Sequence, residues 1–232
     1  MILPTGHERS KTMGESKSYV VRRAGGPVRL ACDDPCWAPA DRLTIDEFPW
    51  YESGTKQGTT AAMLYDDSAV YVLFICEDSH IHAREIRPNG DVYLDSCVEL
   101  FAKPGAGEGD GYFNFEANCC GTVHLGFGPA RGGRRLAGDD VLAAVAVAGS
   151  VPTPTRDETP GDDGWWLAAK LPFAAIGQLA GAKVAAAPGA VWRANFYRCG
   201  GKTDPQYACW KAIECEKPDF HRPEFFGTLT FE

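Results

Sequence analysis

The sequence predicts an all-β protein: a single antiparallel β-sandwich of the jelly-roll or immunoglobulin-like kind, with one short helix and long loops. With 26 Gly and 16 Pro in 232 residues, the chain favours many short strands joined by turns over a helical fold. Short apolar or alternating segments bounded by turn residues follow one another along the chain. We find no internal repeat and no linker between two cores, so we expect one domain over residues 19–232.

Edge strands and a central hairpin are expected first. Residues 19–30 suit one or two edge strands, broken by Gly25, Gly26 and Pro27. Residues 61–64 and 70–75 read as a hairpin around an Asp- and Ser-containing turn. The second of these strands is almost wholly apolar, which is typical of a central strand buried on both faces.

Alternating patterns continue through the rest of the chain. The Val content of residues 141–147 favours a strand over a short helix, and Pro172-Phe173 opens a short helix that runs to about Leu179. Residues 199–224 are expected as one long loop. Further strands are expected at residues 97–101, 112–118, 122–125, 165–171, 191–197 and 228–231.

The charge balance and the N-terminal segment bear on partners and compartment. A net charge of -8 argues against nucleic acid or an anionic membrane as a partner, and no stretch approaches the ~20 apolar residues of a membrane span. Residues 1–18 lack the apolar centre of a signal peptide, so we expect a flexible arm. The nine cysteines are an odd number and cannot all pair within one chain, so we expect reduced thiols in a cytoplasmic protein.

One strand, residues 112–118, organises the functional interpretation. Successive side chains of a strand point to opposite faces, so Phe113, Phe115 and Ala117 share the core face. Tyr112, Asn114, Glu116 and Asn118 share the other face. We interpret this polar row as the floor of a sugar site, and the alternative is an ordinary solvated strand face. Residues 191–197 repeat the pattern, with Arg193, Asn195 and Tyr197 opposite a core-facing row.

Six motifs, in chain order, resemble the family-9 carbohydrate-binding modules. They are residues 71–74, residues 95–101, residues 115–118, Trp165-Trp166 before Leu171-Pro172-Phe173, residues 192–196, and residues 226–229. Two further runs, residues 195–200 and 218–227, resemble the stand-alone "family 9-like" proteins of gut and soil bacteria. The resemblance covers about residues 28–232, nearly the whole domain.

This resemblance implies a β-sandwich that clamps a terminal sugar between two aromatic side chains. Members of the family typically bind the reducing ends of plant glycans such as xylan and cellulose, often with structural calcium. By residue matching, Trp210 takes the place of one clamping ring and Tyr93 lies near the other. Asn118 matches a polar contact, whereas Glu116 stands where other modules carry a basic residue.

The chemistry of a pyranose fits the same residues. Its apolar face packs on aromatic rings, for which Trp210, Tyr93 and Tyr207 are the candidates. Its hydroxyl rim needs planar donors and acceptors. Asn114, Glu116, Asn118, Arg193 and Asn195 supply such groups. We therefore expect a carbohydrate-binding protein with a mono- or oligosaccharide ligand. The family resemblance further implies a role in carbohydrate catabolism, with a glycoside hydrolase as a partner protein.

Other functional classes stay open. Glu99 and Glu116 on neighbouring strands suit the ~5 Å separation of a retaining glycosidase pair. Calcium has Asp78 or Asp95 as candidate ligands. Zinc could use Cys32 with Cys36, or the group Cys199, Cys209, Cys215 and His221, although neither has paired Cys-x-x-Cys spacing. Haem is the least favoured alternative, because no His/Met pair occupies matched strands.

Overall fold

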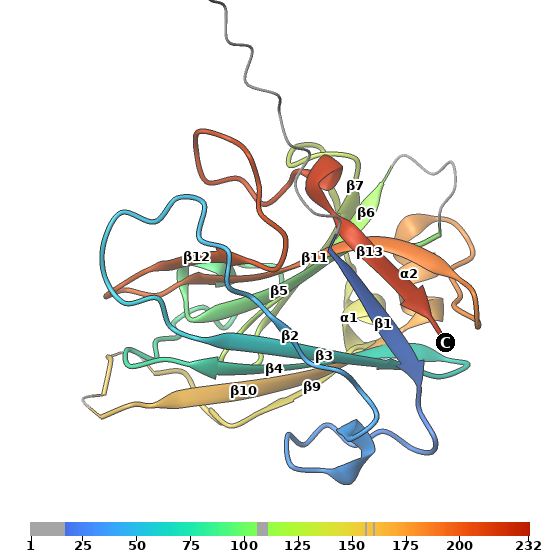
Figure 1. Cartoon of the computed structure of the whole chain (residues 1–232), viewed down its shortest axis with the longest axis horizontal. Helices are drawn as coiled ribbons and strands as arrows, with labels where there is room; N and C mark the ends of the chain where they lie inside the picture. The colour runs from blue at the N-terminus through green and yellow to red at the C-terminus, as the bar shows by residue number, and fades with distance from the viewer. Residues whose placement is uncertain (1–16, 106–110, 156, 160) are drawn as a thin grey trace, which may run out of the picture.

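Two β-sheets are stacked face to face in the computed structural model (Figure 1). The structure describes residues 17–105, 111–155, 157–159 and 161–232. Within these residues, none of the helices has the length and apolar character needed to cross a membrane. The arm predicted for residues 1–18 lies outside the described residues up to position 16, and the first strand begins at Ser18.

The first sheet has the strand order β8-β7-β6-β5-β11-β13. Every neighbouring pair in it is antiparallel. A short strand, β12, pairs with the C-terminal half of β11, along the edge whose N-terminal half pairs with β13. The strands are β5 (Cys97–Lys103), β6 (Tyr112–Asn118), β7 (Val123–Gly128), β8 (Arg135–Leu136), β11 (Val191–Gly200), β12 (Gln206–Cys209) and β13 (Gly227–Phe231).

The second sheet contains β3, β4, β10 and β9 in that order, with β2 on the edge of β3. Its strands are β2 (Leu43–Thr44), β3 (Thr59–Tyr65), β4 (Ala69–Glu77), β9 (Ala146–Gly149) and β10 (Gly164–Pro172). The predicted hairpin is confirmed as β3 and β4. Strand β1 (Ser18–Arg23) joins the two sheets, since it pairs in parallel with β13 and then with β3. Among the described strands, β1 alone departs from the predicted antiparallel pairing.

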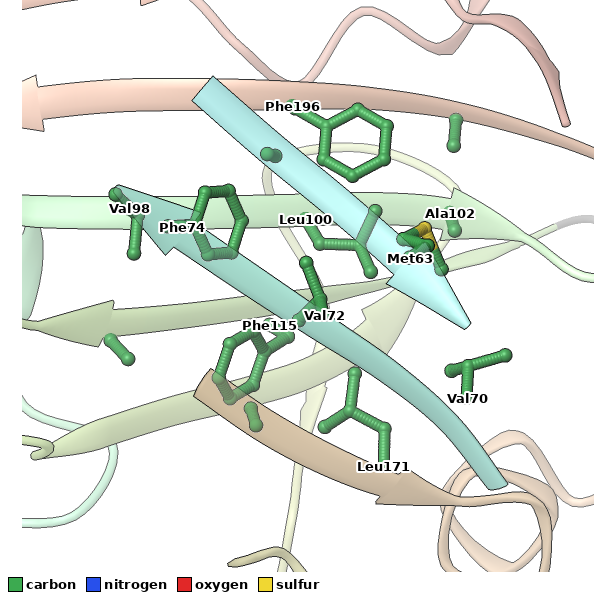
Figure 2. Packing of buried hydrophobic residues seen from close by; sticks show 14 of the residues in the cluster. Met63, Val70, Val72, Phe74, Val98, Leu100, Ala102, Phe115, Leu171 and Phe196 are labelled. Carbon is green, nitrogen blue, oxygen red and sulfur yellow. The ribbon is translucent and has the colours of Figure 1, made fainter. Parts of the chain in front are cut away.

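The main hydrophobic core lies between the two sheets. Figure 2 shows Val72 and Phe74 of β4 packed toward Leu100 of β5, Phe115 of β6 and Phe196 of β11. The rings of Phe74 and Phe196 meet edge to face, with centroids 6.3 Å apart. A second apolar cluster covers the outer face of β5, β6 and β11, and a third covers the outer face of β3, β4 and β10. Strand β4 is thus buried on both faces over most of its length, as predicted.

Short helices connect the strands. The predicted helix is confirmed as α2 (Phe173–Ala180), which ends at Gly181 in the left-handed conformation. The strand predicted over residues 141–147 is wrong in its first half, where α1 (Asp139–Ala144) precedes β9. Asp139 and Asp140 in its first turn stabilise the positive end of the helix dipole, a local signal that outweighs the Val content. Single 3-10 turns are η1 (Pro35–Trp37), η2 (Val92–Leu94) and η3 (Pro223–Phe225).

The facing predicted for β6 is confirmed. Phe113, Phe115 and Ala117 lie in the main core. Asn114 and Glu116, with Asn118, point to the outer face of the sheet and are nevertheless buried. The sequence pattern therefore assigned the faces correctly, whereas the cover over the polar row comes from other segments.

Candidate functional site

A cavity of about 530 Å³ lies on the outer face of β5, β6 and β11, within the range of small-molecule sites. It is lined by five of the residues that the sequence predicted as ligand-binding or catalytic, namely Tyr93, Glu99, Asn114, Glu116 and Tyr207. The sequence reasoning missed its other lining residues as contributors to this site, which are Phe101, His124, Arg131, Arg134, Leu136, Cys199, Pro218, Asp219, Phe220 and His221.

Two tyrosine rings form exposed walls of this cavity. Tyr93 on η2 is 48% exposed and Tyr207 on β12 is 41% exposed. Tyr207 is supported by Phe220, which meets it edge to face with ring centroids 6.5 Å apart. A glycine at position 200 lets η2 approach β11, because an added Cβ would lie 1.9 Å from the carbonyl oxygen of Asp95. Gly200 also has φ +72°, which other residues rarely adopt.

The floor of the cavity is a hydrogen-bonded polar row on β6. Asn114 Nδ2 donates to Glu116 Oε1 at 2.7 Å, and Arg134 Nε donates to Asn114 Oδ1 at 2.9 Å. The Arg134 guanidinium also lies 4.4 Å from the centre of the Tyr112 ring. Burial raises the pKa of Glu116, although His124 and the Asn114 hydrogen bond oppose this shift. The row is therefore held rigidly in place before any ligand arrives.

Glu99 and Glu116 face each other directly across β5 and β6. Glu99 Oε1 accepts a hydrogen bond from Cys199 Sγ at 2.9 Å, while Oε2 is buried without a partner among the described residues. Burial raises the pKa of Glu99 well above its ordinary value, and the neighbouring Cys199 and Glu116 raise it further. Both carboxyl groups are therefore harder to ionise than carboxyl groups in water.

Two histidines complete the rim. His124 Nδ1 donates to the carbonyl oxygens of Asn89 and Gly90, at 3.1 and 3.2 Å, because a carbonyl oxygen can only accept. His221 Nδ1 lies 2.8 Å from the Tyr112 hydroxyl, and burial lowers the pKa of His221 to about 3. His221 lies in the 218–227 run that resembles family signatures, whereas the position of His124 on β7 offered no periodic signal.

Three of the expected ligand contacts instead hold the fold together. Asn118 Nδ2 donates to the Glu85 carbonyl oxygen and to Asp95 Oδ2, at 2.9 and 2.8 Å. Asn195 bonds both the carbonyl oxygen and the backbone nitrogen of Lys211, at 2.8 and 2.9 Å. Arg193 donates to the carbonyl oxygens of Phe226 and Gly227 at the far end of β11. None of these three side chains lines the cavity.

Tyr197 is also absent from the cavity wall. It is fully buried, and its ring stacks on Phe220 with centroids 4.2 Å apart and planes 9° apart. Its hydroxyl donates to the Phe220 carbonyl oxygen at 3.1 Å. Tyr197 thus supports the segment that carries Phe220.

The expectation that Trp210 stacks above the polar floor is corrected by its position in the core. Trp210 is 4% exposed, belongs to the main core and meets Phe196 edge to face at 5.6 Å. The physical reason is that β12 forms within the segment expected as a loop. Its alternation directs Ala208 and Trp210 inward and leaves Tyr207 facing outward.

Asp78 and Asp95 do not fit as calcium ligands, because their oxygens already accept protein hydrogen bonds. Asp78 Oδ2 accepts from Ser96, Trp165 and Arg198, and Oδ1 accepts from the backbone of His80. Asp95 accepts from the backbone nitrogens of Arg84 and Glu85 and from Asn118. Both carboxylates are internal acceptors that anchor loops at the sheet edge.

The zinc groupings suggested by the sequence are not formed. All nine cysteines are free, which agrees with the expected reduced thiols. Neither Cys32 with Cys36 nor the Cys199, Cys209, Cys215 and His221 group brings three ligand atoms together within the described part of the chain.

Comparison with known proteins shows which family this chain resembles. The model of carbohydrate-binding family 9 matches residues 38–231. No curated protein matches the chain. A crystal structure from Bacteroides uniformis ATCC 8492, of a protein with a provisional carbohydrate-binding assignment, is 27% identical with a TM-score of 0.81. The match covers 94% of this chain and 100% of that one.

More distant structures share the fold. A family-9 module from Caldicellulosiruptor kristjanssonii, in complex with cellotriose, is 15% identical with a TM-score of 0.60 over 93% of this chain and 94% of that one. A module of the same organism in complex with glucose gives the same identity and TM-score, over 93% and 96%. The family match spans most of the 232 residues, and so the chain belongs to carbohydrate-binding family 9.

Proposed function

We propose that this protein binds a carbohydrate in the cavity between Tyr93 and Tyr207. The observation that carries the proposal is the combination of two half-exposed phenol rings with a buried, hydrogen-bonded polar floor in one cavity. The rings offer surfaces for the apolar face of a sugar ring, and the floor offers partners for its hydroxyls.

The electrostatics of the floor favour an uncharged ligand. Burial raises the pKa values of Glu99 and Glu116, so ionising either of the two facing carboxyl groups costs more than it does in water. A cationic sugar would lose its hydration shell here, and it lacks the affinity for thiolates by which a metal ion displaces protons. A neutral sugar instead exchanges water hydrogen bonds for those of carboxyl and carboxamide groups.

Family membership supports the class of ligand. Related modules bind cellotriose and glucose, so we propose a mono- or oligosaccharide for this chain, with the reducing end of a glycan such as xylan as one form. We further propose a role in carbohydrate catabolism beside a glycoside hydrolase. The nine free thiols support the cytoplasm as its compartment.

A glycoside hydrolase activity is the second candidate, because Glu99 and Glu116 are cross-strand neighbours. A retaining mechanism needs one ionised nucleophile and one protonated acid. Here burial raises the pKa values of both carboxyl groups, and Arg131, which favours the ionised form of Glu99, acts less strongly than the burial that opposes it. Turnover of aryl glycosides that disappears in Glu116→Gln would establish this activity.

A glycan array and calorimetric titration with glucose and cellotriose test the proposal. We expect at least one sugar to bind the wild type. Loss of the Tyr93 ring in Tyr93→Ala should weaken that sugar about 10- to 100-fold, since one stacked ring is worth about 1–3 kcal/mol by analogy with base stacking. The matched control is Tyr51→Ala, because Tyr51 is 47% exposed but lies outside this cavity. A wild type that binds no sugar, or equal effects of both substitutions, would overturn the proposal.

A further inference from the structure

Two thiols and a carboxyl group converge at the base of the cavity. Cys97 of β5 and Cys199 of β11 are register partners on adjacent antiparallel strands. Glu99 lies two residues after Cys97 and therefore on the same face of β5. One ligand atom from each of the three residues lies within 4.8 Å of the others, and all three residues are buried.

The hydrogen bonding of this cluster is incomplete. Glu99 Oε1 accepts a hydrogen bond from the Cys199 thiol at 2.9 Å. Glu99 Oε2 has no partner among the described residues, although the residue is only 2% exposed. A buried oxygen without a donor destabilises the fold unless a ligand supplies the missing partner. Glu99 and Cys199 both line the cavity, so the buried, unpartnered oxygen lies directly behind the cavity wall.

The backbone around the cluster is fixed from below. The buried guanidinium of Arg198 donates to the carbonyl oxygens of Cys97 and Cys199, at 3.3 and 2.8 Å. Arg198 is held in turn by its ion pair with Asp78. This bridge ties β5 to β11 at the level of the two thiols, so the ligand atoms are held near one another in advance.

We propose that Cys97, Glu99 and Cys199 bind a zinc-class divalent cation. Two thiolates and one carboxylate form a donor set that suits Zn²⁺, whereas calcium and magnesium prefer oxygen alone. Three protein ligands would leave a fourth position for water or a ligand oxygen, and two of the three, Glu99 and Cys199, line the cavity. A tetrahedral site with Zn–S bonds of about 2.3 Å places its sulfurs about 3.8 Å apart, which fits the observed cluster.

Proton balance makes the binding dependent on pH. Zn²⁺ takes the place of the protons on the two thiols and on the carboxyl group, and these protons pass to solvent. The bound cation carries two positive charges against three negative ligands. The site differs from both zinc groupings considered from the sequence, and it does not depend on sugar binding.

Cobalt titration of the reduced, metal-free full chain tests the site directly. We expect one equivalent of Co²⁺ to produce a thiolate-to-cobalt charge-transfer band, and one equivalent of Zn²⁺ to abolish it. Cys97→Ser and Cys199→Ser should each lower Zn²⁺ affinity by more than the roughly 10- to 100-fold that loss of an outer partner of a metal ligand costs. Glu99→Gln should weaken binding while keeping the thiolate band.

Cys215→Ser is the matched control, since this partly exposed thiol lies outside the cluster and should leave the titration unchanged. X-ray absorption of the zinc-loaded wild type provides a readout that needs no variant, with two sulfur ligands expected. A shell of oxygen and nitrogen alone, a charge-transfer band of unchanged intensity in Cys97→Ser and Cys199→Ser, or no stoichiometric binding would overturn the proposal. Sugar titration of the same metal-free protein would show separately whether the proposed carbohydrate function stands.

Discussion

Strands β6 and β11 carry the same sequence pattern and use it differently. Each alternates core residues with an outward row of amides and aromatic rings. On β6 the outward Asn114 and Glu116 form a cavity floor. On β11 the outward Asn195 and Tyr197 are buried under the chain that follows β12.

The difference lies in the cover, which belongs to neither strand. Ile213, Phe220 and Phe226 form an apolar cluster with Tyr197 and Phe101 on the outer face of the sheet. Asn195 fixes this cover at Lys211, and Tyr197 fixes it at Phe220. The cover leaves space above β6, so one polar row meets the cavity while the other supports its wall.

The largest expected effect is a loss of stability when Trp210, a core residue outside the cavity, is replaced. Trp210→Ala should lower the free energy of unfolding by about 3–5 kcal/mol, because it leaves a void in the main core beside Phe196. At about 2–4 °C per kcal/mol for a chain of this size, the melting temperature should fall by roughly 6–20 °C. A calorimetric melt measures this fall. An unchanged melting temperature would return Trp210 to the surface and contradict the inward facing of β12.

A smaller loss of stability is expected on β11. Asn195→Ala leaves the backbone N–H and C=O of Lys211 without their partner, at a cost of about 1–3 kcal/mol of unfolding free energy. Chemical denaturation measures the change. Asn114→Ala is the counterpart on β6 and should weaken sugar binding. The comparison fails if Asn195→Ala abolishes sugar binding while stability stays unchanged.

Stability should also depend on pH, through a histidine at the rim of the cavity. Burial holds the pKa of His221 at about 3 in the folded protein, against an ordinary value of 6.5. The unfolded chain therefore binds a proton first, so this contribution is complete above pH ~6.5 and is lost as the pH falls toward 3. Arg131, Arg134, His124 and Asp219 face His221 and act on the same titration.

Melting temperatures across this range check the sign. In His221→Gln the melting temperature should decline less steeply as the pH falls. His80→Gln is the control, because the side chain of His80 is 36% exposed, and its decline should match that of the wild type. If the wild-type melting temperature does not decline more steeply than that of His221→Gln, the buried neutral state of His221 is wrong.

Single residues show which features of the fold the sequence predicted and which it did not. Alternation placed Phe113 and Phe115 in the core and Asn114 and Glu116 outside it, because strand periodicity is local. Trp210 was misplaced because β12 is short and pairs only with the end of β11, so its alternation was not recognised. The strand predicted over residues 141–147 was wrong in its first half because Asp139 and Asp140 favour the start of a helix there.

The other residues that the sequence did not place correctly depend on which segments cover the outer face of the first sheet. Nothing within β11 shows that Tyr197 will stack under Phe220, 23 residues later in the chain. His124, Arg131 and Arg134 reach the cavity from β7 and the turn that follows it, where no periodic pattern marks them. Sequence periodicity thus fixed the orientation of side chains, while the cavity depended on long-range packing.

The most direct test of this account is a sugar titration of Tyr207→Ala. Tyr207 lies three residues from Trp210 and faces the opposite way, into the cavity. For a sugar that binds the wild type, we predict an affinity about 10- to 100-fold weaker with a melting temperature within a few degrees of wild type. An unchanged affinity would contradict the account, because the cavity between Tyr93 and Tyr207 would then not be the binding site.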